Sequence, residues 1–230
     1  MTRHSSSDPA TPAQGMLVLE GMPGAGKTSI VELLAQENVP VLGEYTSQAA
    51  QTLEHADHPP VHDDDAHDAN WLLKAAQACA LLDRHQVVAC DRDWLSALAY
   101  AHSVADYPLL TARAEWVADQ LAVGRLLLAH TYAVFDLDAA QSQARRGQAV
   151  RAEHPWREAE ALDRARAFYS APISAVARYH PALARTLEAA RWMRLSGSDS
   201  LAVNLVAVRG ALDAVAACRR SLADVHEAAG

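Results

Sequence analysis

The segment GMPGAGKT, from Gly21 to Thr28, constrains the fold of this chain more than any other feature. It matches G-x-x-x-x-G-K-[ST], a pattern whose glycines let backbone N–H groups converge on phosphates. An apolar run, Met16 to Glu20, precedes it, and Lys27 to Gln36 follows with apolar side chains at helical spacing. Strand, loop and helix in this order are what a phosphate cradle requires, because the helix directs its positive end at the same charge. The alternative interpretation is a glycine-rich turn that only connects a strand to a helix.

This loop predicts ATP and Mg²⁺ as cofactors. Lys27 is expected to reach the terminal phosphates and the Thr28 hydroxyl to ligate Mg²⁺. Both also belong to the expected nucleotide contacts, which are Gly21, Pro23, Gly24, Ala25, Gly26, Lys27, Thr28 and Ser29.

Strand-like and helix-like patterns alternate along the chain, which predicts an α/β fold with a five-stranded parallel sheet, helices on both faces and a helical lid. The expected strands are residues 16–20, 39–43, 86–90, 131–137 and 192–195. The clearest expected helices after the loop are residues 27–36, 69–84, 94–103 and 109–120, and a long one begins near Leu201, where Ser198 or Asp199 can cap it. We expect residues 1–15 to be a disordered tail and residues 16–230 a single domain.

Composition limits the partners. The formal net charge is −8, so we expect no nucleic-acid polymer, whose binding needs a broad positive surface. The apolar stretch between Arg125 and Asp136 is about half of the ~20 residues that cross a bilayer, so no membrane is expected. The three cysteines are far apart and odd in number, which indicates free thiols and a cytoplasmic location. Oligomeric state stays open, with a homodimer possible.

Charged residues follow the second and third expected strands, where ligands of open α/β sheets bind. Glu44, after VPVLG, is placed to accept the proton of an attacking hydroxyl as a general base; a solvated loop acid is the alternative. Asp91, after QVVAC, is a candidate Mg²⁺ ligand, and Arg92 a candidate to stabilise phosphate charge; an Asp-Arg ion pair is the alternative.

Arginines gather after the fourth expected strand, at Arg145, Arg146 and Arg151. A lid over about residues 145–160 that brings these cations over the phosphates on closure would exclude water. Surface arginines that complement a helix dipole are the alternative.

The segment between His55 and Asp68 mixes histidines and aspartates. It lacks the regular spacing of a structural zinc site, so we expect a solvated loop over the acceptor site and keep a metal site as the alternative. Trp71 and Trp94 are candidates to bracket a flat acceptor, although tryptophans more often pack in a core.

The order of these parts resembles thymidylate kinases and the related deoxynucleoside kinases, which have the P-loop NTPase fold. The matching pieces are LEGMPGAGKT, the acid in VLGEYT, the helix NWLLKAAQACALL, VVACDRDWLSALAY and TYAVFDLDAAQSQARRG, followed by RARAFY. The resemblance implies metal and phosphate roles for Asp91 and Arg92 and a base role for Glu44. It also places Gln77 where nucleoside kinases read the base; a solvated helix residue is the alternative. Independently of the resemblance, Lys74 and Gln77 are three residues apart on one helix edge, beside the apolar stripe, so we expect both to face a cleft and contact the acceptor.

Departures from that family bear on the acceptor. The loop has Met22 and Pro23 where thymidylate kinases usually have an acid or arginine, and the helix shows Ala76 and Gln77 in place of an arginine for the acceptor's phosphate. We therefore expect a kinase that moves the γ-phosphoryl group of ATP to a hydroxyl of a nucleoside or a nucleoside-like or antibiotic-like metabolite. The alternatives are a nucleoside-monophosphate kinase of the thymidylate type and a nucleotide-dependent regulatory ATPase or binding protein.

Overall fold

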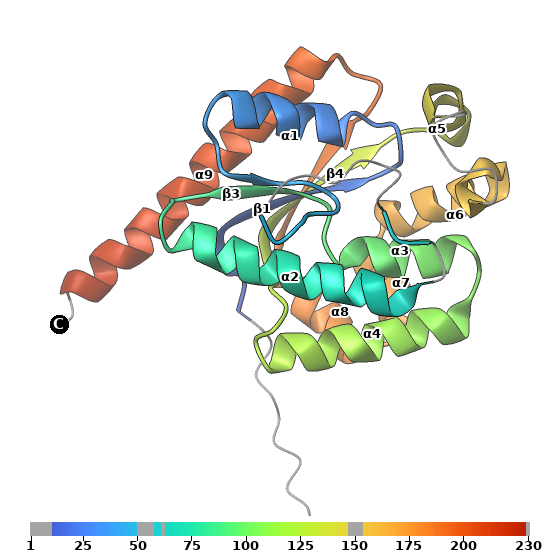
Figure 1. Ribbon diagram of the computed structural model, residues 1–230, viewed down its shortest axis with the longest axis horizontal. Coiled ribbons are helices and arrows are strands. Elements are labelled where there is room, and N and C mark those ends of the chain that lie inside the picture. The colour runs from blue at the N-terminus through green and yellow to red at the C-terminus, as the bar shows by residue number, and fades with distance from the viewer. Residues whose placement is uncertain (1–10, 50–57, 61–62, 147–153, 229–230) are drawn as a thin grey trace, which may run out of the picture.

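A single parallel sheet forms the centre of the structure, a computed structural model that describes residues 11–49, 58–60, 63–146 and 154–228 (Figure 1). Its strands stand in the order β2-β3-β1-β4-β5, and each neighbouring pair is parallel. Their bounds are β1 Ala13–Gly21, β2 Val41–Leu42, β3 Val88–Asp91, β4 Ala129–Asp136 and β5 Arg191–Ser196. The predicted five-stranded parallel sheet is confirmed.

Helices cover both faces of this sheet (Figure 1). On one face lie α1 (Lys27–Gln36) and α9 (Leu201–Ala228), and on the other α2, α3 and α6 contact β1, with α4, α7 and α8 packed beyond them. The bounds of this second group are α2 Asp64–Leu82, α3 Leu95–Ser103, α4 Tyr107–Ala122, α6 Ala159–Ser170, α7 Pro172–Ala177 and α8 Pro181–Leu187. Beside α6 lie α5 (Ala139–Arg146) and the short 3-10 helix η2 (Pro155–Arg157).

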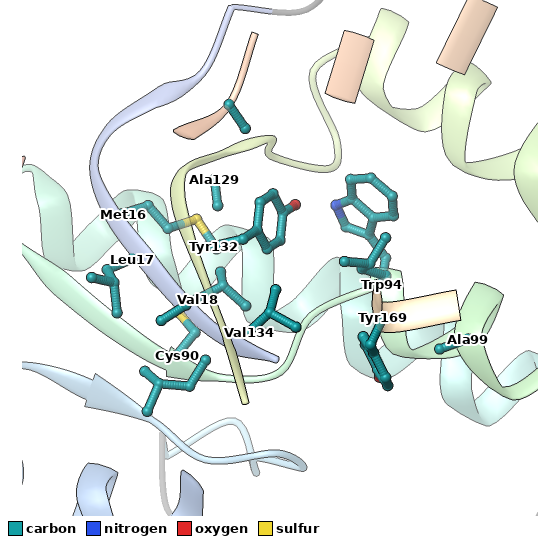
Figure 2. Packing of buried hydrophobic residues seen from close by; sticks show 14 of the residues in the cluster. Met16, Leu17, Val18, Cys90, Trp94, Ala99, Ala129, Tyr132, Val134 and Tyr169 are labelled. Atoms are coloured by element: carbon teal, nitrogen blue, oxygen red, sulfur yellow. The ribbon is translucent and has the colours of Figure 1, made fainter. Parts of the chain in front are cut away.

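The central strand β1 is buried from both sides, so its core residues are apolar in succession rather than in alternation. Met16, Leu17 and Val18 pack with Cys90 of β3 and Tyr132 of β4 (Figure 2). This continuous burial holds in place the ends of β1 and β3, where the charged residues Glu20 and Asp91 lie.

The first residues of β1 were predicted to be part of a tail, and for residues 13–15 this is wrong. The Ala13 N–H donates to the Leu128 carbonyl at 2.7 Å, and Ala13 pairs with Ala129 of β4. Gly15 has a φ of 99°, and the register shifts between Ala13 and Leu17, so the extra pairing needs an irregularity that the apolar pattern did not reveal. Residues 1–10 lie outside the described part of the chain.

Helix starts depart from the predictions where capping side chains act. Helix α2 begins at Asp64 rather than at residue 69, because the Asp63 side chain accepts from Ala66 N and further aspartates suit the first turn. The α9 start is capped by Ser200, whose Oγ accepts from Val203 N at 3.3 Å, and not by the predicted neighbours. The acidic segment before residue 69 is therefore partly helix.

Helix α9 closes one face of the sheet. Its Val208, Leu212 and Val215 are buried, whereas Val203 and Val206 are exposed. By length and composition, α9 is the one helix of the described residues that could cross a membrane, over Leu201–Ser221. A helix that covers a core passes the same test.

Candidate active site

The phosphate loop bends between β1 and α1 as its glycines require. Gly21 has a φ of 119°, and a Cβ there would lie 2.2 Å from the Phe135 carbonyl oxygen, so a side chain would push β1 away from β4. Helix α1 follows Gly26, which is left-handed, and no side chain caps it. Its first N–H groups are thus left for an anion at the positive end of the helix.

Lys27 is buried against its own loop. Its Nζ donates to the carbonyls of Met22 at 2.8 Å and Gly21 at 3.2 Å. Burial, and next the charge of Arg92, lowers the pKa of Lys27 to about 7. With this pKa, the Lys27 amine is only partly protonated at neutral pH.

Thr28 and Asp91 meet at the edge of this loop. The Thr28 hydroxyl donates to Asp91 Oδ2 at 2.6 Å, and Asp91 Oδ1 is buried with no hydrogen-bond partner among the described residues. A hydroxyl and a carboxylate with a spare lone pair are the hard oxygen donors that Mg²⁺ takes. The donor set therefore fits the metal that the loop motif implies.

Arg92 ties the ends of β1 and β3 together. It is 1% exposed and has a φ of 62°, which is uncommon for a residue with a side chain. Its Nη1 donates to the Gly21 carbonyl at 3.1 Å and to Glu20 at 3.3 Å, and its Nε forms an ion pair with Glu44 at 3.0 Å. The pKa of Arg92 is raised because the opposing carboxylates outweigh its burial.

Glu44 stands at the end of β2 with its side chain 28% exposed. Burial raises its pKa, but the charges of Arg92, Lys27 and Arg146 outweigh it, so the pKa lies below the ordinary value. The carboxylate is thus ionised at neutral pH and faces the phosphate loop, Arg92 and an open pocket together.

That pocket is lined mostly by aromatic and histidine side chains, with Glu44 and Arg146 among its walls. One group comes from the segment after β2 and from α2, and the other from α3 and η2. The first group is Tyr45, His58, His67 and Trp71, and the second is Tyr100, His154 and Trp156.

Two contacts show how the first group is oriented. His67 Nε2 lies 3.1 Å from the Pro60 carbonyl and so donates to it, which leaves Nδ1 to accept from the Tyr45 hydroxyl at 2.6 Å. The Trp71 indole N–H is buried and has no hydrogen-bond partner among the described residues. A buried indole N–H usually finds a partner, so a ligand atom is the natural one here.

Arg113 and Asp64 form an ion pair at the pocket wall. Arg113 also donates to the Ala97 carbonyl at 3.0 Å and lies over the Tyr100 ring, 5.7 Å from its centroid. Its charge is therefore already compensated within the protein.

The predicted lid is described only at its ends. In α5, the buried Ser142 hydroxyl donates to the Pro23 carbonyl at 2.7 Å, so this helix contacts the phosphate loop. Arg146 lines the pocket, whereas Arg145 donates to the carbonyls of Gly24 and Gly197. Arg151, with the rest of residues 147–153, lies outside the described residues.

Lys74 was predicted to face the cleft, and this is wrong. It is 2% exposed, and its Nζ donates to the carbonyls of Asp91 at 2.6 Å, Arg92 at 2.8 Å and Glu44 at 3.1 Å. Gln77 is likewise outside the pocket wall, because it accepts from the Thr46 hydroxyl and donates to the Ser47 carbonyl. Helical spacing correctly placed Lys74 and Gln77 on one edge of α2, but it could not show that backbone carbonyls of other segments lie opposite that edge.

Trp94 was predicted as a candidate wall of the acceptor site, and this is wrong as well. It is 2% exposed and packs in the core near Tyr132 (Figure 2). Its indole N–H donates to the Leu127 carbonyl at 2.8 Å. Trp71, the other candidate, does line the pocket.

Part of the histidine and aspartate segment lies at the pocket. His58, Pro59 and His67 line it, and no cluster able to hold a metal ion is found among the described residues. Positions 55–57 and 61–62 lie outside the described residues.

Several site residues were missed by sequence reasoning. Glu20 is buried beside Arg92, and its signal was an acid at the end of an otherwise apolar strand. Tyr100, Arg113 and Trp156 come from separate segments and carry no local motif.

Comparison with known proteins gives the family. A family model described as an AAA domain matches residues 16–171, from β1 to the end of α6. The chain belongs to this AAA domain family. No curated protein matches its sequence.

Solved structures of deoxyadenosine kinase from M. mycoides are similar to the AAA-domain chain in fold. The structure with bound dATP has a TM-score of 0.56 at 10% identity, and the match covers 86% of this chain and 99% of the kinase chain. The structure with bound dCTP has a TM-score of 0.53 at 11% identity, with the same coverage. The predicted P-loop kinase fold is thereby confirmed.

Proposed function

We propose that this protein is a kinase that transfers the γ-phosphoryl group of ATP, with Mg²⁺, to a hydroxyl of a small aromatic acceptor such as a nucleoside. The observation that carries the proposal is the place of Glu44: its ionised carboxylate is paired with Arg92 near the phosphate loop and also lines the aromatic pocket. The deoxyadenosine kinases of similar fold bind nucleotides, which supports the same class of reaction here.

Each charged residue then has a role in holding or moving charge. The α1 N–H groups and Lys27 bind the triphosphate, and Thr28 and Asp91 hold Mg²⁺, which neutralises phosphate charge when bound. Glu44 accepts the proton of the attacking hydroxyl, while Arg92 and Arg146 stabilise charge on the phosphoryl group in flight. The hydrogen bond of Ser142 to Pro23 holds α5 against the loop, and closure there would keep water away from bound phosphates.

The pocket favours a flat acceptor with a polar edge. Tyr45 and Trp71 on one side and Tyr100 and Trp156 on the other suit a planar ring. The Trp71 N–H has no partner among the residues that the structure describes, and it is available to an oxygen or nitrogen at the edge of such a ring. A saturated polyhydroxylated acceptor would leave these rings without stacking partners.

A nucleoside monophosphate is a poorer acceptor for the same pocket. Its dianion needs uncommitted cations, but Arg113 is paired with Asp64, and Arg92 is shared by Glu20 and Glu44. Arg146, also in the pocket wall, is needed for the phosphoryl group that is transferred. We therefore propose a neutral hydroxyl acceptor, used in the cytoplasm.

Acceptor-dependent ADP release tests the proposal. Purified protein with Mg-ATP is assayed against panels of nucleosides, nucleoside monophosphates and aminoglycosides. We expect slow ATP hydrolysis alone and fast ADP formation with one or more nucleosides. Stimulation by monophosphates only, or by no small molecule, would contradict the proposal.

A further inference from the structure

Glu20 is a charged residue with no exposed surface, directly before the phosphate loop. Its carboxylate accepts hydrogen bonds from Arg92, from the Ser96 hydroxyl at 2.8 Å, from the Tyr169 hydroxyl at 3.0 Å and from Asp93 N at 3.0 Å. Burying a carboxylate is costly unless it is paired and hydrogen-bonded, and here both conditions are met.

The residues that bind Glu20 also bind the Arg92 side chain. Tyr169 also accepts from Arg92 Nη1 at 3.1 Å, and so does Ser96 at 3.0 Å, so the partners of Glu20 are those of the guanidinium as well. The guanidinium lies over the Trp156 ring, 5.6 Å from its centroid, and reaches Glu44 through Nε. Glu20 therefore holds one side of Arg92, while the guanidinium also contacts Glu44 and Trp156, which line the pocket.

Stability alone does not explain this buried pair. Apolar residues of similar volume commonly serve a core as well as a buried ion pair does. Arg92 moreover keeps a left-handed backbone with a φ of 62°, a conformation that is costly for a residue with a Cβ. Both costs are incurred at the residue that orients Glu44.

We propose that Glu20 is a positioning residue for phosphoryl transfer: its carboxylate, fixed by Tyr169 and Ser96, holds the Arg92 guanidinium between the end of the phosphate loop and Glu44. This inference rests on the proposed kinase function. Glu20 itself touches neither acceptor nor phosphate.

The test replaces Glu20 by glutamine, which keeps the shape, removes the charge and turns an amide NH₂ towards one of two donors, Arg92 or the Asp93 N–H. We expect kcat to fall by about 100-fold, the loss that a misplaced group of this kind causes, while KM for ATP and acceptor changes little. Glu115→Gln, at an exposed site on α4, is the matched control and should keep full kcat. Tyr169→Phe removes a hydroxyl that donates to Glu20 and accepts from Arg92, without changing charge, and should lower kcat by less, in the same direction.

A crystal structure of Glu20→Gln supplies a readout that needs no acceptor. We expect the Arg92 guanidinium to leave the Gly21 carbonyl and Glu44. An unmoved guanidinium, or unchanged kcat in a folded variant, would overturn the inference. If glutamine prevents folding, the same two readouts on Tyr169→Phe decide it. Absence of any acceptor activity in the unsubstituted protein would instead refute the proposed function, and the crystal structure would still decide how Arg92 is held.

Discussion

Lys27 shows how a single buried cation links nucleotide binding to pH. With a pKa of about 7 in the free protein, its amine is partly neutral under ordinary conditions. Phosphates against Nζ favour the charged form, so binding raises this pKa and takes up a proton.

We therefore predict that the affinity for Mg-ATP falls as pH rises above about 7, by up to about tenfold per pH unit. Isothermal titration calorimetry in buffers of different ionisation enthalpy measures the proton taken up. Lys27→Arg stays charged throughout and is the control, with little pH dependence expected between pH 7.5 and 9. Equal pH dependence in both proteins would assign the proton to another group.

Glu44 is the residue whose chemistry the proposed function needs most. In Glu44→Gln the side chain keeps its size and loses its basicity, so we predict a fall in kcat of about 100-fold or more. The affinity for Mg-ATP should change little, because the loop amides and Lys27 are untouched. Steady-state kinetics and calorimetry separate the two quantities, and full activity of the variant would rule out the base role.

What the sequence revealed at this scale depends on how local the signal was. The loop motif, Glu44 and Asp91–Arg92 sit at strand ends that hydrophobic patterns locate, and the structure has them there. The predictions for Lys74 and Trp94 were wrong because both side chains donate hydrogen bonds to backbone carbonyls of distant segments.

At the scale of elements, the pocket depends on where helices begin. The first turn of α2 carries Asp64 and His67, so the cap at Asp63 positions part of the pocket wall. The order and type of the segments were predictable from apolar periodicity, but the start of α2 was not, because the aspartates resembled a solvated loop.

We predict that Asp63→Ala destabilises the protein by about 1 kcal/mol, the usual cost of a lost cap, and raises KM for the acceptor. Thermal or denaturant unfolding and steady-state kinetics measure the two effects. Asp65→Ala, in the same turn but without a capping bond, is the matched control and should change stability by only a few tenths of a kcal/mol. Equal effects of both variants would point to the charge of the turn instead of the cap.

At the scale of the whole molecule, α9 and the helices of the opposite face enclose one sheet. The alternation of patterns predicted this architecture because each parallel strand needs cover on both sides. Sequence reasoning did not predict how the pocket is assembled, since its walls come from α2, α3, α4 and η2, which only the folded chain brings together.

Burial on α9 predicts a sharp difference between its two faces. Leu212→Ala removes a side chain that is 5% exposed and should lower the free energy of unfolding by about 2–5 kcal/mol. Val206→Ala, at a site that is 65% exposed, is the control and should have almost no effect. Denaturant titrations of both variants give the comparison, and a similar loss in each would mean that α9 buries its other face.

The Lys74 ammonium donates its hydrogen bonds to main-chain carbonyl oxygens of Glu44, Asp91 and Arg92. These hydrogen bonds do not depend directly on which side chains those positions carry. Exchanging the Glu44 or Asp91 side chain therefore leaves the backbone contacts of Lys74 in place. Variants of Glu44 and Asp91 can therefore be interpreted as changes in chemistry, whereas substitution of Arg92 would also leave the buried Glu20 carboxylate without its charge partner.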